Sequence, residues 1–137
     1  MTERINIEDC ELDDSLVLYD GLPFSGVLYS LHENGGIAHE QEYENGLPHG
    51  NCEEFYLSGK LKRMWFSRNG RQEGNLVELY ENGTKKLEEF SEFGVLMSSK
   101  EWDEDGNLIT ADELDPKSDA HAYVEDCKKR RMLRENR

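Results

Sequence analysis

Short runs of alternating apolar and polar residues follow one another along most of this chain, and glycine-containing turns separate them. In residues 27–32, VLYSLH, the alternate positions Val27, Tyr29 and Leu31 share one side. Such alternation is typical of a β-strand whose two faces have different surroundings. The pattern predicts strands at 15–19, 26–33, 37–43, 51–57, 61–67, 75–81, 85–91, 95–103 and 107–110.

The turn glycines recur with a common period. Three columns share a spacing of 24 residues: Gly35, Gly59 and Gly83, followed after 23 by Gly106; Gly46, Gly70 and Gly94; and Gly26, Gly50 and Gly74. Such a period predicts tandem units, each made of two strands and two turns. Asn-Gly and Asp-Gly pairs accept positive φ at both centres of a type I′ turn, so each pair predicts a hairpin tip. We therefore expect an all-β antiparallel meander of β-hairpin repeats.

Three of these units resemble a known family. The segments LHENGGIAHEQEYENGLPHG, FYLSGKLKRMWFSRNGRQEG and LYENGTKKLEEFSEFG are similar to the MORN-repeat variant family, bacterial tandem repeats, over residues 19–109. Two positions depart from the family pattern: Phe93 stands where Asn is expected, and His32 stands where the column of Tyr56 and Tyr80 would begin. The resemblance implies a MORN-like repeat scaffold, and some members of that family are antitoxin or immunity components of toxin systems.

A different pattern begins after Ile109, where the chain contains no further glycine. Asp115-Pro116 is a boundary signal, and Ser118 or Asp119 is suited to cap a helix that runs to about Arg134. An apolar stripe at helical spacing predicts that this helix packs against one face of the sheet or caps the last hairpin, and the alternative is a detached helix that binds a partner. The stripe consists of Ala120, Tyr123, Val124 and Cys127.

The chain is thus expected to have two parts. Residues 1–115 form the repeat β-sheet domain, and residues 116–137 form the C-terminal helix. The repeats are placed at about 26–49, 50–73 and 74–97, with a partial one at 98–110.

Composition limits both the core and the kind of partner. Only 36% of the 137 residues are apolar and 34% are charged, which favours one domain with a thin or one-sided core. Six basic side chains and one acidic one fall in residues 128–137, which leaves 10 basic against 29 acidic in residues 1–127, a net charge of −19. Such a field attracts a basic protein partner and repels nucleic acid and anionic membrane lipid. We therefore expect no nucleic acid and no membrane among the partners.

Cellular location is predicted from two features. Residues 1–14 are polar and acidic, and no run approaches the roughly 18 apolar residues of a membrane span, so neither an export signal nor an anchor is expected. The cysteines, Cys10, Cys52 and Cys127, are odd in number and widely spaced, which indicates neither a disulfide framework nor a zinc site. Both features favour a reducing cytoplasm.

Catalytic and metal-binding patterns are weak. The four histidines are scattered, and Ser98-Ser99 has no base or glycine elbow around it. Residues 101–112 imitate part of a calcium loop but lack the bidentate Glu at the twelfth position, and Asp105-Gly106 falls in the turn column. Paired carboxylates such as Glu53-Glu54 point to opposite faces of a strand and do not form one acid–base pair. We expect no catalytic residue, metal or cofactor.

One face of the sheet is expected to remain exposed, because one short helix does not cover both faces of a single layer. Leu31, Phe55, Leu79 and Trp102 form a column on one face, and His32, Tyr56 and Tyr80 one on the other. An exposed apolar stripe among carboxylates is typical of a protein-binding surface. The candidate partner-binding residues are Phe55, Tyr56, Tyr80 and Trp102, surrounded by Glu54, Glu78 and Glu81.

These expectations favour stoichiometric binding over catalysis. Together with the family resemblance, they suggest an immunity or antitoxin protein that neutralises a cognate bacterial toxin by direct binding. A basic nuclease-type toxin fits the charge, since carboxylates would fill its substrate cleft. The alternative hypothesis is a MORN-repeat scaffold or adaptor for protein–protein interaction without an immunity role. An enzyme is the third hypothesis, and no residue pattern supports it.

Overall fold

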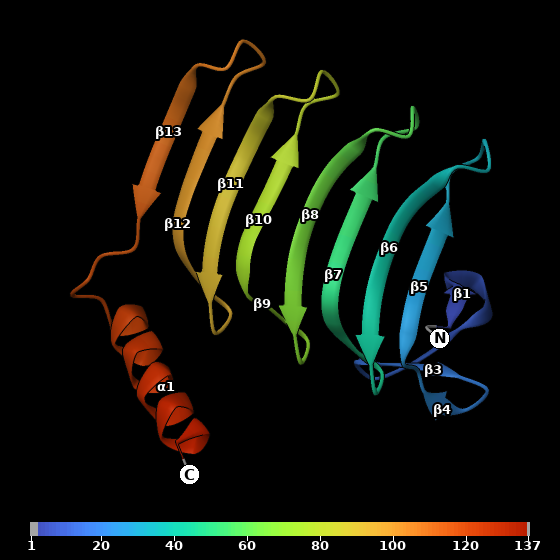
Figure 1. Cartoon of the computed structure of the whole chain (residues 1–137), viewed down its shortest axis with the longest axis horizontal. Helices are drawn as coiled ribbons and strands as arrows, with labels where there is room; N and C mark the ends of the chain where they lie inside the picture. Colours follow the sequence, from blue (N-terminus) through green and yellow to red (C-terminus); the bar gives the residue numbers. More distant parts are fainter. Residues whose placement is uncertain (1–2, 137) are drawn as a thin grey trace.

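A computed structural model describes residues 3–136, and most of these form one long, open sheet of curved strands (Figure 1). From β5 onward every neighbouring pair of its long strands is antiparallel, which confirms the predicted meander. In spatial order the strands are β1 (Arg4–Asn6), β5 (Gly26–Leu31), β6 (Ile37–Glu44), β7 (Leu47–Phe55), β8 (Leu61–Arg68), β10 (Gly74–Leu79), β11 (Lys85–Glu92), β12 (Val95–Trp102) and β13 (Leu108–Glu113), with β9 (Arg71–Gln72) beside β8.

The N-terminal segment departs from the expected meander. The strand predicted at 15–19 forms as β3 (Leu16–Tyr19), but it pairs with β2 (Glu11–Asp13) and β4 (Leu22–Pro23) in a separate small sheet. The reason is the tight hairpin at Asp20-Gly21, which pairs β4 with β3, so that β3 does not join the long sheet. The short strand β1, which the sequence pattern does not predict, pairs with β5 in parallel and leads into the 3-10 turn η1 (Ile7–Asp9).

The main apolar core lies where the small sheet meets the first strands of the long sheet. Ile5, Phe24 and Leu28 are buried there, and Val17 and Tyr43 pack against them. The Val17 amide donates to the Gly46 carbonyl at 2.9 Å, which ties the small sheet to the turn after β6. The largest cluster of buried apolar residues therefore lies at the N-terminal end of the long sheet.

Turns at the two ends of the strands are of different kinds. In Asn45-Gly46, Asn69-Gly70 and Phe93-Gly94 both residues have positive φ, the geometry predicted for a two-residue type I′ turn. At Asn34-Gly35, Asn82-Gly83 and Asp105-Gly106 only the glycine has positive φ, so the type I′ prediction is wrong for these pairs.

The second kind of turn has a clear physical cause. The Gly35 amide donates to the His32 carbonyl at 2.9 Å and the His32 amide donates to the Gly36 carbonyl at 2.8 Å, which gives a type I turn closed by a glycine bulge. The Asn34 side chain accepts from the Gly36 amide at 3.0 Å. That bond holds Asn34 in a right-handed conformation, which a type I′ turn does not allow.

Side chains at the start of each of these turns join successive repeats. The Tyr56 hydroxyl donates to the Leu79 carbonyl at 2.7 Å, and the Tyr80 hydroxyl donates to the Trp102 carbonyl at 2.8 Å. His32, where the repeat pattern expects a tyrosine, makes the equivalent contact with its Nε2 atom 2.9 Å from the Phe55 carbonyl. The column therefore has a structural role, because each ring satisfies a backbone carbonyl of the next repeat.

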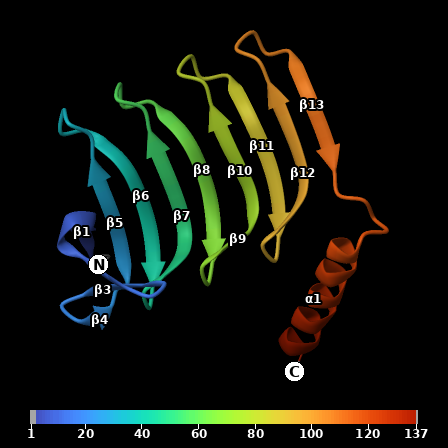
Figure 2. The same cartoon turned by 180° about the vertical axis from the view of Figure 1, so that it is seen from behind.

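The C-terminal helix α1 (Asp119–Glu135) forms as predicted, with the Ser118 hydroxyl accepting from the His121 amide at its N-cap. Both views place it beyond the turn ends of the sheet rather than across a face (Figures 1 and 2). Val124 is completely buried. Strand β13 is exposed along its length, so the helix does not cover the last strand. Among residues 3–136 no helix is both long and apolar enough to cross a membrane.

Phe93 accounts for the place where the helix docks. The Arg131 guanidinium lies 4.3 Å from the centre of the Phe93 ring, and the same group pairs with Glu73 at 3.0 Å. Phe93 has a φ of 52°, a left-handed conformation that is uncommon for an aromatic residue. Phe93 thus replaces the Asn that the repeat pattern expects, a residue better suited to this turn, and in return provides a contact with α1.

Candidate partner-binding surface

The strand register divides the long sheet into two faces, because residues paired across antiparallel strands point to the same side. One face, which we call the polar face because of its ion pairs, carries the row His39–Glu54–Arg63–Glu78 and the shorter row Gln41–Cys52–Trp65. The other, which we call the apolar face, carries the row Glu53–Met64–Val77–Glu88, and on the same side Asn51 pairs with Phe66 while Phe90 pairs with Asn75 and with Ser98 on β12.

Charges on the polar face largely neutralise one another. Arg63 lies between two carboxylates, 3.1 Å from Glu78 and 3.7 Å from Glu54. Lys86 adds a second cation 3.5 Å from Glu78, a residue that is only 8% exposed. Buried carboxylates of this kind require cationic partners, so this cluster stabilises the sheet and offers few free charges.

His39 and Cys52 meet on the same face, where the thiol sulfur lies 3.2 Å from the imidazole Nε2. Burial, with added repulsion from Glu54 and Glu53, raises the pKa of Cys52 to about 12. Burial also lowers the pKa of His39, although nearby carboxylates oppose this effect. The two groups are therefore a neutral thiol and a neutral imidazole at pH 7, unlike the thiolate pair of a cysteine nucleophile.

Burial of His39 predicts a specific pH dependence. Because its pKa is lower in the folded than in the unfolded chain, the unfolded chain binds more protons as the pH falls below about 6.5. His39 therefore favours unfolding below that pH, and this contribution is absent above it. Urea unfolding between pH 7.5 and 5 should show the wild type losing more stability than His39→Gln. Parallel pH profiles for the two proteins would contradict the assignment.

An exposed strip crosses the apolar face. Met64 is 44% exposed and Phe90 is 37% exposed. Val77 pairs with Met64, and Phe66 lies on the same face. A hollow of about 320 Å³ over β7, β8 and β10 adjoins a second of about 370 Å³ over β10 to β13, and Asn75 lines both. We call Met64, Phe66, Val77 and Phe90 the apolar strip.

Carboxylates border the apolar strip. Glu53 lines the first hollow, and Glu88 and Glu113 line the second. Glu88 is paired with Lys85 at 2.6 Å, whereas Glu53 and Glu113 have no cation within 4.0 Å among residues 3–136. An apolar centre with a charged margin is the usual anatomy of a protein-binding surface.

The residues predicted for partner binding do not form one patch. Strand alternation puts Phe55 and Trp102 on the apolar face, near the turn ends of β7 and β12. Glu54 and Glu78 come together around Arg63 on the polar face. Glu81 is exposed in the turn after β10.

The two tyrosines of that set have other partners. The hydroxyls of Tyr56 and Tyr80 bond to backbone carbonyls of the next repeat. Lys86 lies 5.6 Å from the centre of the Tyr80 ring while it pairs with Glu78, so Tyr80 lies on the polar side. Their role as partner anchors remains a prediction.

Sequence reasoning missed the apolar strip as a candidate site. Phe66 and Phe90 are one repeat apart and lie on the same face of the sheet. Their 24-residue spacing is the sequence signal that could have identified them. The spacing alone does not show that both side chains lie on the same face, which follows only from the register of β8 against β10.

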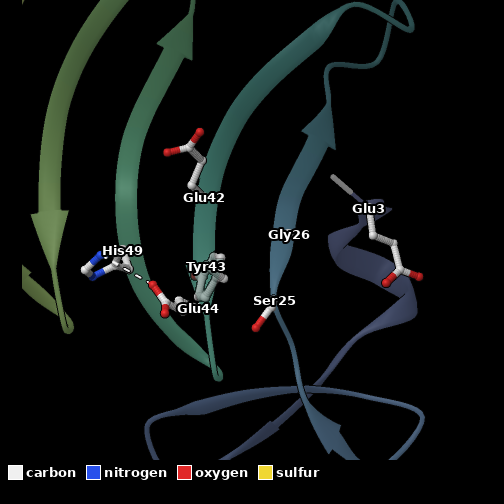
Figure 3. Close-up of a pocket in the computed structure, with 7 residues that line it drawn as sticks. All are labelled: Glu3, Ser25, Gly26, Glu42, Tyr43, Glu44 and His49. Atoms are coloured by element: carbon white, nitrogen blue, oxygen red, sulfur yellow. Dashed lines mark ion pairs between the residues drawn. The ribbon is translucent and has the colours of Figure 1, made fainter. Parts of the chain in front are cut away.

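A third hollow, of about 440 Å³, lies where β5, β6 and β7 approach the N-terminal segment (Figure 3). Its lining includes Glu3, Glu42, Glu44 and His49, and Glu44 pairs with His49 at 3.4 Å. Glu42 accepts from the Asn51 amide at 2.7 Å. The carboxylates point in different directions (Figure 3) and do not converge on one point, so the hollow offers negative charge to a basic side chain rather than a metal site.

The segment that imitates a calcium loop is a hairpin turn. Asp103 accepts hydrogen bonds from the Asp105 and Asn107 amides, and the Asn107 bonds lower the pKa of Asp103. Within residues 3–136 no group of three His, Cys, Asp or Glu side chains is placed to hold a metal ion.

Calcium is accordingly expected to leave the protein unchanged. The oxygens of Asp103 already accept hydrogen bonds within the turn. Adding CaCl2 to about 5 mM, a concentration that would roughly saturate a weak calcium site, should therefore not shift the melting temperature, and adding EDTA should not shift it either. Differential scanning calorimetry measures this directly. A calcium-dependent increase of several degrees would show that residues 101–112 bind the ion.

Comparison with known proteins finds a relative of this chain but no family model and no solved structure. No protein-family model matches the chain, so the MORN-repeat assignment stays a prediction. No solved structure matches it either. A protein of Bacillus subtilis (strain 168) named Immunity protein YwqK is 42% identical over 99 residues, which is 72% of this chain and 64% of that protein. The match thus spans a little less than two thirds of the length of this relative.

Proposed function

We propose that this protein is an immunity protein that neutralises a bacterial toxin by direct stoichiometric binding. The similarity to a relative named as an immunity protein, at 42% identity over 72% of the chain, is the observation that carries the proposal. The apolar strip with its acidic border supports binding as the mode of action, because exposed apolar patches rimmed by polar residues mark interaction sites. The neutral Cys52–His39 pair supports binding over catalysis.

Charge favours a basic toxin, and we propose a nuclease-type domain in the cytoplasm. Residues 1–127 carry a net charge of −19, and many of these carboxylates are exposed. A nuclease cleft is basic because it binds phosphates, so an acidic protein is complementary to it. The hollow beside Glu42 and Glu44 would accept a lysine or arginine of the toxin.

The test begins with affinity capture of the tagged protein from its native host and identification of what binds. The captured partner is then expressed alone and together with this protein. Immunity predicts that the partner alone stops growth and that co-expression restores it. A partner that binds and has no effect on growth would instead support the alternative, a scaffold or adaptor without an immunity role.

Association with the captured partner should depend strongly on salt. Raising NaCl from about 0.05 to 0.5 M should slow association at least tenfold and change dissociation much less, because salt screens the approach of exposed charges more than desolvated contacts. Surface plasmon resonance gives both rates across the series. An association rate independent of salt would mean that the acidic surface does not steer binding.

A further inference from the structure

Although the chain is acidic, a strongly basic hollow lies between helix α1 and the turn at β9. Two adjoining cavities of about 280 and 510 Å³ share Arg71, Phe93 and Arg134 in their linings. Arg68 and Arg131 complete the first cavity, and Arg130 lines the second. We call this feature the arginine hollow. Neither the apolar strip nor the proposed immunity role makes use of it.

The arginines of the hollow fall into two groups. Arg68 and Arg131 share the carboxylate of Glu73, at 2.9 and 3.0 Å, and Arg130 pairs with Asp126 at 3.0 Å. Arg71 and Arg134 have no carboxylate within 4.0 Å among residues 3–136. Of these pairs, Arg131–Glu73 joins the helix to the sheet. Arg71 donates a 3.5 Å hydrogen bond to the Tyr123 hydroxyl of the helix, and both Arg71 and Arg134 remain available to a carboxylate of a ligand.

The hollow already accommodates one carboxylate of this chain. Glu73 sits between two guanidinium groups at its margin, which shows the spacing at which the arginines receive an anionic side chain. Guanidinium groups form strong, directional hydrogen bonds to carboxylates. Two further guanidinium groups, those of Arg71 and Arg134, line both cavities and offer the same chemistry.

The lining is not purely charged. Phe93, Cys127 and Leu133 supply apolar surface, and Leu133 is largely exposed. The two cavities share Arg71, Phe93 and Arg134, so guanidinium groups and apolar surface lie side by side in the hollow. This combination suits a short peptide segment that carries both acidic side chains and an apolar one.

We propose that the arginine hollow binds an acidic peptide segment of a protein partner. Its carboxylates pair with Arg71 and Arg134, and its apolar side chain packs against Phe93 and Leu133. A second copy of this chain is disfavoured as the partner, because each copy carries a net charge of −14. The proposal does not depend on the identity of any toxin, since it concerns a surface outside the apolar strip.

The test uses a fluorescein-labelled peptide, Asp-Asp-Leu-Asp-Asp, and fluorescence anisotropy at about 0.15 M salt, where long-range repulsion by the acidic body is screened. We expect saturable binding that weakens about tenfold or more in the double variant Arg71→Ala/Arg134→Ala, because charge-assisted bonds are lost. The matched control is Lys129→Ala, which removes a positive charge from the same helix outside the hollow and should change affinity less than about twofold.

Two further probes separate the contributions of charge and apolar contact. The neutral peptide Asn-Asn-Leu-Asn-Asn should not bind, and Asp-Asp-Ser-Asp-Asp should bind several-fold more weakly than the leucine peptide. Chemical shift changes in a ¹⁵N-labelled sample should centre on Phe93 and Leu133. Circular dichroism melts of the double variant should stay close to those of the wild type, since the Arg131–Glu73 ion pair still joins the helix to the sheet and Arg71 loses only a long, exposed hydrogen bond to Tyr123.

Three outcomes would overturn the proposal. One is the absence of saturable peptide binding. Another is equal loss of affinity in Lys129→Ala and in the double variant, which would show a diffuse charge effect. The third is tighter binding of inorganic phosphate than of the leucine peptide, which would assign the hollow to phosphate-bearing ligands instead.

Discussion

Replacing Gly26 with alanine should destabilise the protein by about 3–5 kcal/mol, the largest stability effect expected for a single methyl group in this fold. Gly26 has a φ of 145°, which an L-residue rarely adopts. A Cβ atom there would collide with the Glu3 carbonyl oxygen and lie 2.9 Å from the Phe24 ring. Both groups are fixed, because the Glu3 carbonyl accepts from Val27 and Phe24 belongs to the main core.

Urea unfolding and a thermal melt would measure this effect, with an expected fall in melting temperature of about 10 °C or more. Gly83→Ala is the matched control, since Gly83 also has positive φ, 91°, but a Cβ atom at this position would have no neighbouring atom within 4 Å. It should cost only about 1 kcal/mol of conformational strain. Equal losses in the two variants would show that the N-terminal segment does not pack against β5.

Replacing Met64 and Phe90 together with serine should weaken binding of the captured partner about a hundredfold or more. Both side chains are partly exposed on the apolar strip, so their loss removes less packing from the free protein than loss of a core residue would. In a complex they would be desolvated near the centre of the contact, where a few apolar residues supply most of the affinity. The dissociation rate should account for most of the change.

Surface plasmon resonance on the double variant measures this loss. Met132→Ser is the control, because Met132 is also exposed but lies on α1, away from the strip. Binding by the Met64→Ser/Phe90→Ser protein at wild-type strength, with an unchanged melting temperature, would exclude the apolar strip as the contact surface.

The repeated hairpins were predictable because their information is local. The alternation in residues 27–32 and the glycine spacing reflect strand geometry and turn conformation, which depend on neighbouring residues. Helix α1 was predictable for the same reason, since Ser118 and the stripe around Val124 are signals within one helix.

Other features depend on contacts distant in sequence. Strand β3 forms where the local alternation predicts it. Its place in a separate small sheet, however, follows from the Asp20-Gly21 turn and from the hydrogen bond between Val17 and Gly46. The apolar strip needs the register of β8 against β10, which no local signal specifies. The role of Phe93 became clear only with Arg131 above its ring.

The turn conformations show a limit of a different kind. Asn-Gly favours a type I′ turn, but Asn34 uses its side chain to accept from Gly36, and the hairpin closes with a bulge instead. The same dipeptide at Asn45-Gly46 adopts positive φ at both residues. The dipeptide alone thus permits both turns, and the side-chain bond of Asn34 accompanies the bulged one.

The most direct test of the central claim, neutralisation by stoichiometric binding, is a titration of the purified partner's toxic activity with this protein. If the partner is a nuclease, cleavage of a fluorescent nucleic-acid substrate is the readout. The proposal predicts that activity falls linearly and ends at one molar equivalent, and that Met64→Ser/Phe90→Ser requires a large excess. A partner that stays fully active with several equivalents of wild-type protein bound would contradict it.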